Sequence, residues 1–218
     1  MQRHMVWFPL VALSCCCAGS LGAQAILRAA PSGRATSEVS LSFPRPAAAP
    51  AMTGMTGMAG MAGMPAPPAP ATAPAAPAPL VIRVDYGQPH LRGRVLHGDS
   101  LVPYGKAWRT GAGGSTLLST DVDLMLGGKP LARGTYVLYS IPDRAEWMLV
   151  VQRNVKQSPM QYADSNDVAR IPLRHVTLAS PFESFTMWLI PDAGSGPARG
   201  ELRFAWGTDQ LSAEWALR

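Results

Sequence analysis

Apolar and polar residues alternate with a period of two along most of the chain after residue 80. The alternation is clearest in residues 184–189, 201–206 and 211–218. It predicts half-buried β-strands, because successive side chains of a strand face opposite sides of a sheet. No segment keeps a 3.6-residue period, so we predict that residues 80–218 form one all-β domain, an antiparallel β-sandwich or roll.

The runs Thr135–Ile141 and Trp147–Val151 are apolar on both faces, which places them at the centre of the sheets. Gly127-Gly128 predicts a tight hairpin turn, since glycine readily adopts the positive φ that such turns need. Two short runs, 81–86 and 91–96, are also predicted as strands.

Two further features concern the C-terminal third. A strand is expected over residues 168–178, and its apolar phase slips near His175, which predicts a β-bulge there. After this slip, Val176 and Leu178 carry the expected apolar face. The runs 202–206 and 211–217 are expected to pair as a hairpin across Gly207-Thr208-Asp209.

Residues 26–79 have a different composition, rich in alanine and proline, with almost no periodic apolar pattern. We predict that this segment is a disordered linker, because it cannot bury a core. It contains a repeat with methionine at every third position. The repeat fits a low-complexity linker, or alternatively a periplasmic site for Cu(I), which prefers sulfur ligands. The candidate ligands would be Met52, Met55, Met58, Met61 and Met64.

The N-terminus has the features of a secretory signal. Arg3 precedes an apolar run from Val6 to Ala18, and Ala23-Gln24-Ala25 has the form of a cleavage site. We predict a signal peptide over residues 1–25, a periplasmic or extracellular location, and no membrane span after signal removal, because a span needs about 20 apolar residues. All three cysteines, Cys15 to Cys17, lie in this segment, so the mature chain should form no disulfides.

The formal charge of +5 comes almost entirely from scattered arginines. Nucleic-acid binding needs basic residues concentrated on one face, so we expect no nucleic-acid partner. No motif for a cofactor is present, and none is expected.

The segment 104–110 concentrates aromatic and hydrogen-bonding groups. The candidate ligand-binding residues are Tyr104, Lys106, Trp108, Arg109 and Thr110. The rings could stack on a sugar or an apolar ligand, and Arg109 could hold a carboxylate in bidentate fashion. Alternatively, the segment is an ordered crossover in which Trp108 fills the core and Arg109 pairs with a neighbouring acid or with carbonyls.

Other chemistry has weak support. His97 and His175 could meet, but they lack a metal-binding spacing and a nearby acid pattern. No Gly-x-Ser-x-Gly elbow is present. The acid pairs Asp121/Asp123 and Asp164/Asp167 fall in turns, whereas a glycosidase needs two separated carboxylates in a cleft. We therefore assign no catalytic residues.

Three motifs stand out. Residues 101–112 read Leu-Val-Pro-Tyr-Gly-Lys-x-Trp-Arg-Thr-Gly-Ala, and residues 127–142 read Gly-Gly-Lys-Pro-Leu-x-x-Gly-Thr-Tyr-x-Leu-Tyr-x-Ile-Pro. The third motif is the Glu-Trp pair at residues 146–147. Together they resemble the bacterial family called domain of unknown function 2911, over about Arg83 to Leu217. The resemblance implies an exported β-rich domain with no established activity. Where that family usually has Asn-Glu after Gly-Ala, this chain has Gly113-Gly114, which counts against an enzyme.

The sequence thus favours an exported, non-catalytic binding or structural domain whose partner is a small molecule or an envelope component. A carbohydrate-active hydrolase is the alternative, and it would need carboxylates that converge near Arg109. Copper handling through Met52–Met64 is a third hypothesis.

Overall fold

The computed structural model of the protein describes residues 32–42, 77–97, 101–153, 158 and 160–218. The described elements are nine strands and one 3-10 turn: β1 Gly33–Leu41, β2 Leu80–Gln88, β3 Thr116–Thr120, β4 Leu124–Leu126, β5 Lys129–Leu131, β6 Gly134–Ile141, β7 Trp147–Gln152, η1 Asp164–Asn166, β8 Asp167–Pro191 and β9 Arg199–Leu217. In this part of the chain no helix is long and apolar enough to cross a membrane.

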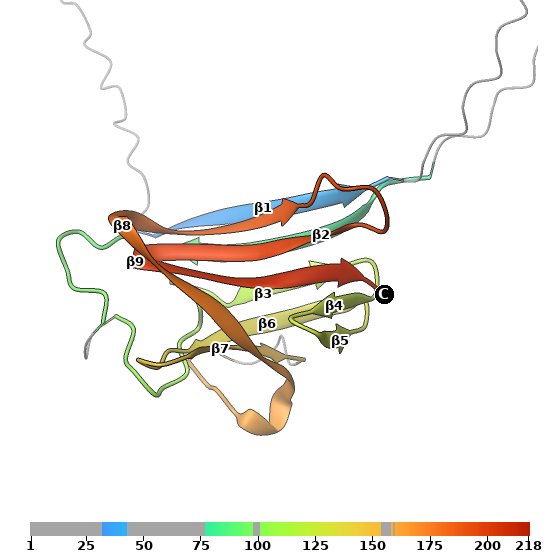
Figure 1. Cartoon of the computed structure of the whole chain (residues 1–218). Coiled ribbons are helices and arrows are strands. Elements are labelled where there is room, and N and C mark those ends of the chain that lie inside the picture. The colour runs from blue at the N-terminus through green and yellow to red at the C-terminus, as the bar shows by residue number, and fades with distance from the viewer. Residues whose placement is uncertain (1–31, 43–76, 98–100, 154–157, 159) are drawn as a thin grey trace, which may run out of the picture.

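The strands pair in the order β1-β2-β3-β6-β7-β8-β9-β4-β5, and every pairing is antiparallel (Figure 1). This order confirms the predicted all-β class. The glycine pair at 127–128 joins β4 to β5 with φ of 52° and 75°, as expected for a tight turn. Strands β6 and β7 lie at the centre and are buried on both faces, also as predicted.

Strand β8 belongs to both halves of the sheet. Its first part pairs with β7 as far as Trp147 opposite Leu173, and from Arg174 opposite Ser212 onward it pairs with β9. In Figure 1 this strand runs diagonally across the front of the molecule. One continuous strand therefore turns the sheet back over itself, as in a β-roll.

The two halves of the sheet enclose a common core. Phe185 on β8 meets the edge of Tyr86 on β2 at 5.6 Å between ring centroids, so strands from opposite halves touch directly. Phe185, Met187, Leu202, Phe204 and Trp215 are at most 2% exposed. The period-two alternation of β8 and β9 thus places its apolar positions inside.

Where β1 lies beside β8, a side chain joins two otherwise separate strand edges. The backbone N–H of Leu189 donates to Ser37 Oγ at 2.8 Å. An unpaired strand edge exposes a row of backbone groups, and this bond satisfies one of them. The roll is thereby fastened between the first strand of the sheet and the outer part of β8.

Strand β1 corrects the prediction that residues 26–79 are all disordered linker. Gly33–Leu41 pairs with β2 along its whole length, from Gly33 opposite Gln88 to Leu41 opposite Leu80. The strand has a period-two pattern in which Val39 is buried and the alternate positions are exposed. The surrounding alanine- and proline-rich sequence hid this short alternation. The rest of the expected linker up to residue 76, the expected signal peptide and Met52–Met64 lie outside the described residues.

The predicted C-terminal hairpin is also wrong. Residues 199–217 form the single strand β9, and its hairpin partner is β8. Gly207 has φ of 59° but only bends the strand, at a place where the β8–β9 register shifts. A glycine followed by an acid signals a turn locally, and the long partner strand keeps the backbone extended instead.

Two smaller predictions change as well. The phase slip at His175 marks the place where β8 leaves β7 and joins β9, and the shifts in the β8–β9 register lie further on, beyond Thr177. Val176 does not face the core, since it is 36% exposed. The run 91–96 is an irregular connection and not a strand.

Candidate functional site

The candidate segment 104–110 divides its side chains between the core and the surface. Trp108 is 9% exposed; its ring stacks on Trp206 at 5.8 Å and meets the edge of Phe185 at 5.2 Å. Its backbone exchanges two hydrogen bonds with Ser140 on β6, at 2.7 and 2.8 Å. Trp108 therefore anchors the segment to the core, as the structural alternative expected.

Thr110 is completely buried and has φ of 51°, a left-handed conformation that β-branched residues rarely adopt. Polar neighbours hold it there. Its hydroxyl is 2.8 Å from Ser140 Oγ, and the hydroxyl of Thr116 donates to the Thr110 carbonyl at 2.7 Å. This network fixes the backbone directly beside Arg109, so Thr110 shapes the segment without facing a ligand.

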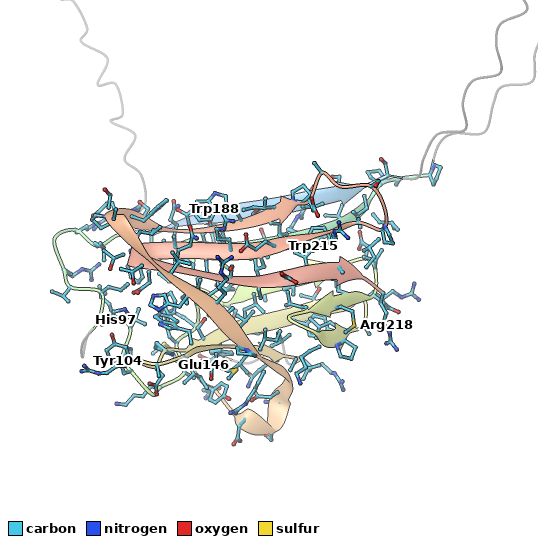
Figure 2. All side chains as sticks on the ribbon, in the orientation of Figure 1. His97, Tyr104, Glu146, Trp188, Trp215 and Arg218 are labelled. Carbon is cyan, nitrogen blue, oxygen red and sulfur yellow. The ribbon has the colours of Figure 1, made fainter. Side chains whose placement is uncertain are left out.

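Tyr104 and Lys106 are exposed and lie apart from the groove described below. The Tyr104 ring stacks on His97 at 4.7 Å, and the guanidinium of Arg144 lies 5.3 Å from the centre of the same ring. Figure 2 shows His97 and Tyr104 near each other, at the end of the molecule far from Arg218.

A groove of about 390 Å³ brings two of the five predicted residues together, Trp108 and Arg109. It lies between the 101–112 segment, the start of β1 and the 160–162 segment. Its described lining is mainly aromatic and apolar, with two arginines and no acidic residue: Ser32, Pro89, Arg94, Leu101, Pro103, Ala107, Trp108, Arg109, Gly111, Ala112, Tyr139, Met160, Tyr162 and Trp206.

Arg109 has no carboxylate partner in the described part of the chain. Its Nη1 donates to the thioether sulfur of Met160 at 3.0 Å, and its Nε donates to the Gly111 carbonyl at 3.4 Å. A thioether is a weak acceptor, and a guanidinium normally finds an anion or several carbonyls. Of the predicted pairing with an acid or with carbonyls, the described residues show a carbonyl bond, to Gly111, and no acid.

The second arginine of the groove, Arg94, already donates hydrogen bonds to the protein backbone. It donates to the carbonyls of Leu91 and His90 at 2.9 and 2.7 Å, bonds that fold the local backbone into a turn. Arg94 adds positive charge to the groove, and two of its five N–H donors are used in these backbone bonds.

The tyrosines that line the groove, Tyr139 and Tyr162, contact each other, and Tyr162 is hydrogen-bonded to residues outside the groove lining. The Tyr162 hydroxyl donates to Asp167 at 3.0 Å and accepts from Arg170 at 2.9 Å, while Gln152 donates to the other Asp167 oxygen at 2.8 Å. Burial, and then the bond to Asp167, raise the pKa of Tyr162 to about 12. Burial also raises the pKa of Tyr139, whose ring lies 5.3 Å from that of Tyr162.

A larger groove of about 720 Å³ lies along β8, β9 and the β4–β5 hairpin, and its lining carries both arginines and acids. Arg199 bonds Asp192 at 2.9 Å, and Glu201 is paired with Arg203. The pairing with Arg199 lowers the pKa of Asp192. Because its lining mixes two arginines with three acids, this surface favours neither an anion nor a cation as clearly as the groove at Arg109 does.

The structure also contains a cluster that the sequence did not predict. Asp209 is 9% exposed and bonds two histidines, His97 Nε2 at 2.5 Å and His175 Nε2 at 2.7 Å. A carboxylate only accepts, so each bonded Nε2 carries the hydrogen. The cluster fastens the connection after β2 to β8 and β9. Its members are 112 and 34 residues apart, and Asp209 sits in an apparent turn, so no local sequence signal links them.

No group of three or more histidine, cysteine, aspartate or glutamate side chains in the described ranges is arranged to hold a metal ion. Both Nε2 atoms of the histidine pair are already bonded to the carboxylate. The site is a groove lined mainly by apolar and aromatic residues, with the guanidinium of Arg109 in its lining.

The fold and the groove together define an all-β roll with a partly enclosed, positively charged surface groove. The family model described as "Protein of unknown function (DUF2911)" matches residues 69–214, and the chain belongs to this family. No curated protein matches the chain, and no solved structure does. Strand β1 precedes the matched region.

Proposed function

We propose that this protein is an exported, non-catalytic binding domain that takes up a small molecule in the groove at Arg109. The observation that supports this most directly is the guanidinium of Arg109, which lies in a groove lined mostly by apolar and aromatic residues and has no acid paired with it in the described chain. Charged side chains in partly buried places usually have a partner of opposite charge. A ligand that supplies this partner would be bound in one orientation.

A binding function fits the groove better than carbohydrate hydrolysis does. A glycosidase places two carboxyl groups on opposite sides of the scissile bond. The described groove lining contains none, and Asp167, behind Tyr162, already bonds Gln152, Tyr162 and Arg170. The two glycines at 113–114 directly follow two lining residues, at the positions where the family resemblance would place Asn-Glu.

Export is supported by the N-terminal charge, apolar run and cleavage pattern, and by the restriction of cysteine to that segment. N-terminal sequencing of protein recovered from the periplasm and the culture medium tests this directly. We expect the mature chain to begin at Ile26. Recovery of the intact N-terminus from the cytoplasm would contradict export and leave the groove proposal standing.

The groove itself can be tested by ligand screening of the mature chain. Trp108 and Trp206 both line it, so binding should change the tryptophan fluorescence and raise the melting temperature. Compounds that bind here should lose affinity in Arg109→Ala. Arg133→Ala is the matched control, because Arg133 is an exposed arginine outside the groove lining. Equal binding by wild type and Arg109→Ala would contradict this location.

A further inference from the structure

From the chemistry of the groove we infer the ligand class: a small aromatic carboxylate, with its carboxylate on Arg109 and its ring among the aromatic residues. This inference rests on the proposed binding function and narrows it. It requires an anionic group at one end, an apolar body at the other, and a size that suits about 390 Å³. Small-molecule sites are commonly about 300–1,000 Å³, so the groove suits a compact ligand.

The anionic end follows from what Arg109 now contacts. Its Nη1 bonds the sulfur of Met160, a weak acceptor, and its Nε makes a long bond of 3.4 Å to the Gly111 carbonyl. A carboxylate would replace this contact with a charge-assisted pair and could accept two parallel N–H bonds from the planar guanidinium. Met160 is 76% exposed, so its side chain can move aside at little packing cost.

The apolar end follows from the polar groups that are already satisfied. The Tyr162 hydroxyl is bonded to Asp167 and Arg170, and Arg94 is bonded to two backbone carbonyls. The hydroxyls of a sugar in this groove would therefore have to compete with these existing bonds. A buried hydroxyl without a hydrogen bond is costly, whereas a ring packs well on aromatic faces.

The charge of the groove lining also favours an anionic ligand. Both charged residues of the described lining are arginines, so a cationic ligand would be repelled and an anion attracted. A phosphate monoester shares the negative charge, but it carries more oxygens, and Arg94 is held in place by its bonds to the carbonyls of Leu91 and His90. One guanidinium fits one carboxylate, so we commit to the carboxylate.

The test compares four probes by calorimetry on the mature chain: 3-phenylpropionate, its neutral amide, phenyl phosphate and glucose. We expect 3-phenylpropionate to bind about tenfold or more tightly than the amide, because the amide loses the charge-assisted bonds. Phenyl phosphate should be weaker than the carboxylate, and glucose should not bind. Arg109→Ala should abolish the preference for the carboxylate over the amide, Arg109→Lys should keep part of it, and Arg133→Ala should keep all of it.

The outcomes separate the ligand class from the function. If the amide, glucose or phenyl phosphate binds at least as well as the carboxylate and this binding depends on Arg109, the class is wrong and the groove function stands. If the carboxylate binds equally well to wild type and Arg109→Ala, both the class and the location are wrong. If 3-phenylpropionate shows no binding at concentrations up to about 10 mM, the proposed ligand class is also wrong, because functional ligands almost always bind with a lower Kd than this.

Discussion

At the scale of single residues, the 104–110 segment combines structural and groove-lining positions. Trp108 and Thr110 are buried, and Trp108 and Arg109 line the groove. One short segment is thus anchored in the core and also presents a guanidinium to the groove. The strained, fully bonded Thr110 then fixes the direction of the chain next to the arginine.

The anchoring role of Trp108 leads to a stability prediction. Trp108→Ala should lower the free energy of unfolding by about 3–5 kcal/mol, because it removes a ring packed against Trp206 and Phe185. Tyr104→Ala removes a ring that is 39% exposed and should cost clearly less. Urea denaturation of both variants measures the difference. A wild-type midpoint for Trp108→Ala would show that the ring does not support the core.

Tyr162 makes the stability depend on alkaline pH. Its folded-state pKa of about 12 lies above the ordinary value of about 10, so the unfolded chain loses this proton first as the pH rises. The stabilisation is complete below pH 10 and is lost between about pH 10 and 12. Urea midpoints across this range should fall less steeply in Tyr162→Phe, whereas Tyr104→Phe should follow wild type. Parallel curves for wild type and Tyr162→Phe would contradict the raised pKa.

At the site, the sequence predicted residues better than it predicted their partners. Trp108 and Arg109 stand out by residue type, and both line the groove. Asp209 could not be found, because its role depends on His97 and His175, which only the pairing of β8 with β9 and the fold of the connection bring to it. Arg109 beside Met160 was equally hidden, since contact between these positions depends on the path of a long connection.

Among the elements, the period-two pattern predicted where strands lie but not how far each one continues. It identified the central strands β6 and β7 correctly, because their apolar residues occupy both faces. It divided β9 at Gly207 and missed that β8 serves both halves of the sheet. Local residue preferences describe a turn, whereas pairing with a long neighbouring strand decides whether the chain turns there.

The β4–β5 hairpin offers an element-scale test with a built-in control. Both turn glycines have positive φ, but a Cβ on Gly127 would come within 2.1 Å of Ile171 Cγ2 on β8, whereas one on Gly128 meets nothing within 4 Å. Gly128→Ala should cost about 1–2 kcal/mol for the backbone conformation alone. Gly127→Ala should cost more, because the hairpin must also move away from β8. Equal unfolding midpoints for the two variants would show that the turn does not press on β8.

For the molecule as a whole, the strand outside the family match closes one side of the roll. The matched region begins at residue 69, while β1 ends at Leu41, so this chain supplies an edge strand from the sequence before it. That strand covers β2 with Val39 buried, pairs Glu38 with Arg83, and bonds β8 through Ser37. Ser32, just before β1, lines the groove, so the sequence that precedes the family match also contributes to the candidate site.

A chain shortened to begin at residue 77 tests whether β1 belongs to the folded unit. Without β1, the edge of β2 and the Leu189 N–H lose their partners, so the urea midpoint should fall well below that of the mature chain. A synthetic peptide of residues 32–42 added in excess should recover part of the loss, because it can pair with the vacant edge. The same peptide with Val39→Asp is the matched control and should recover much less, since it places a charge in the core. A shortened chain as stable as the mature one, or equal recovery with both peptides, would show that β1 is dispensable to the roll.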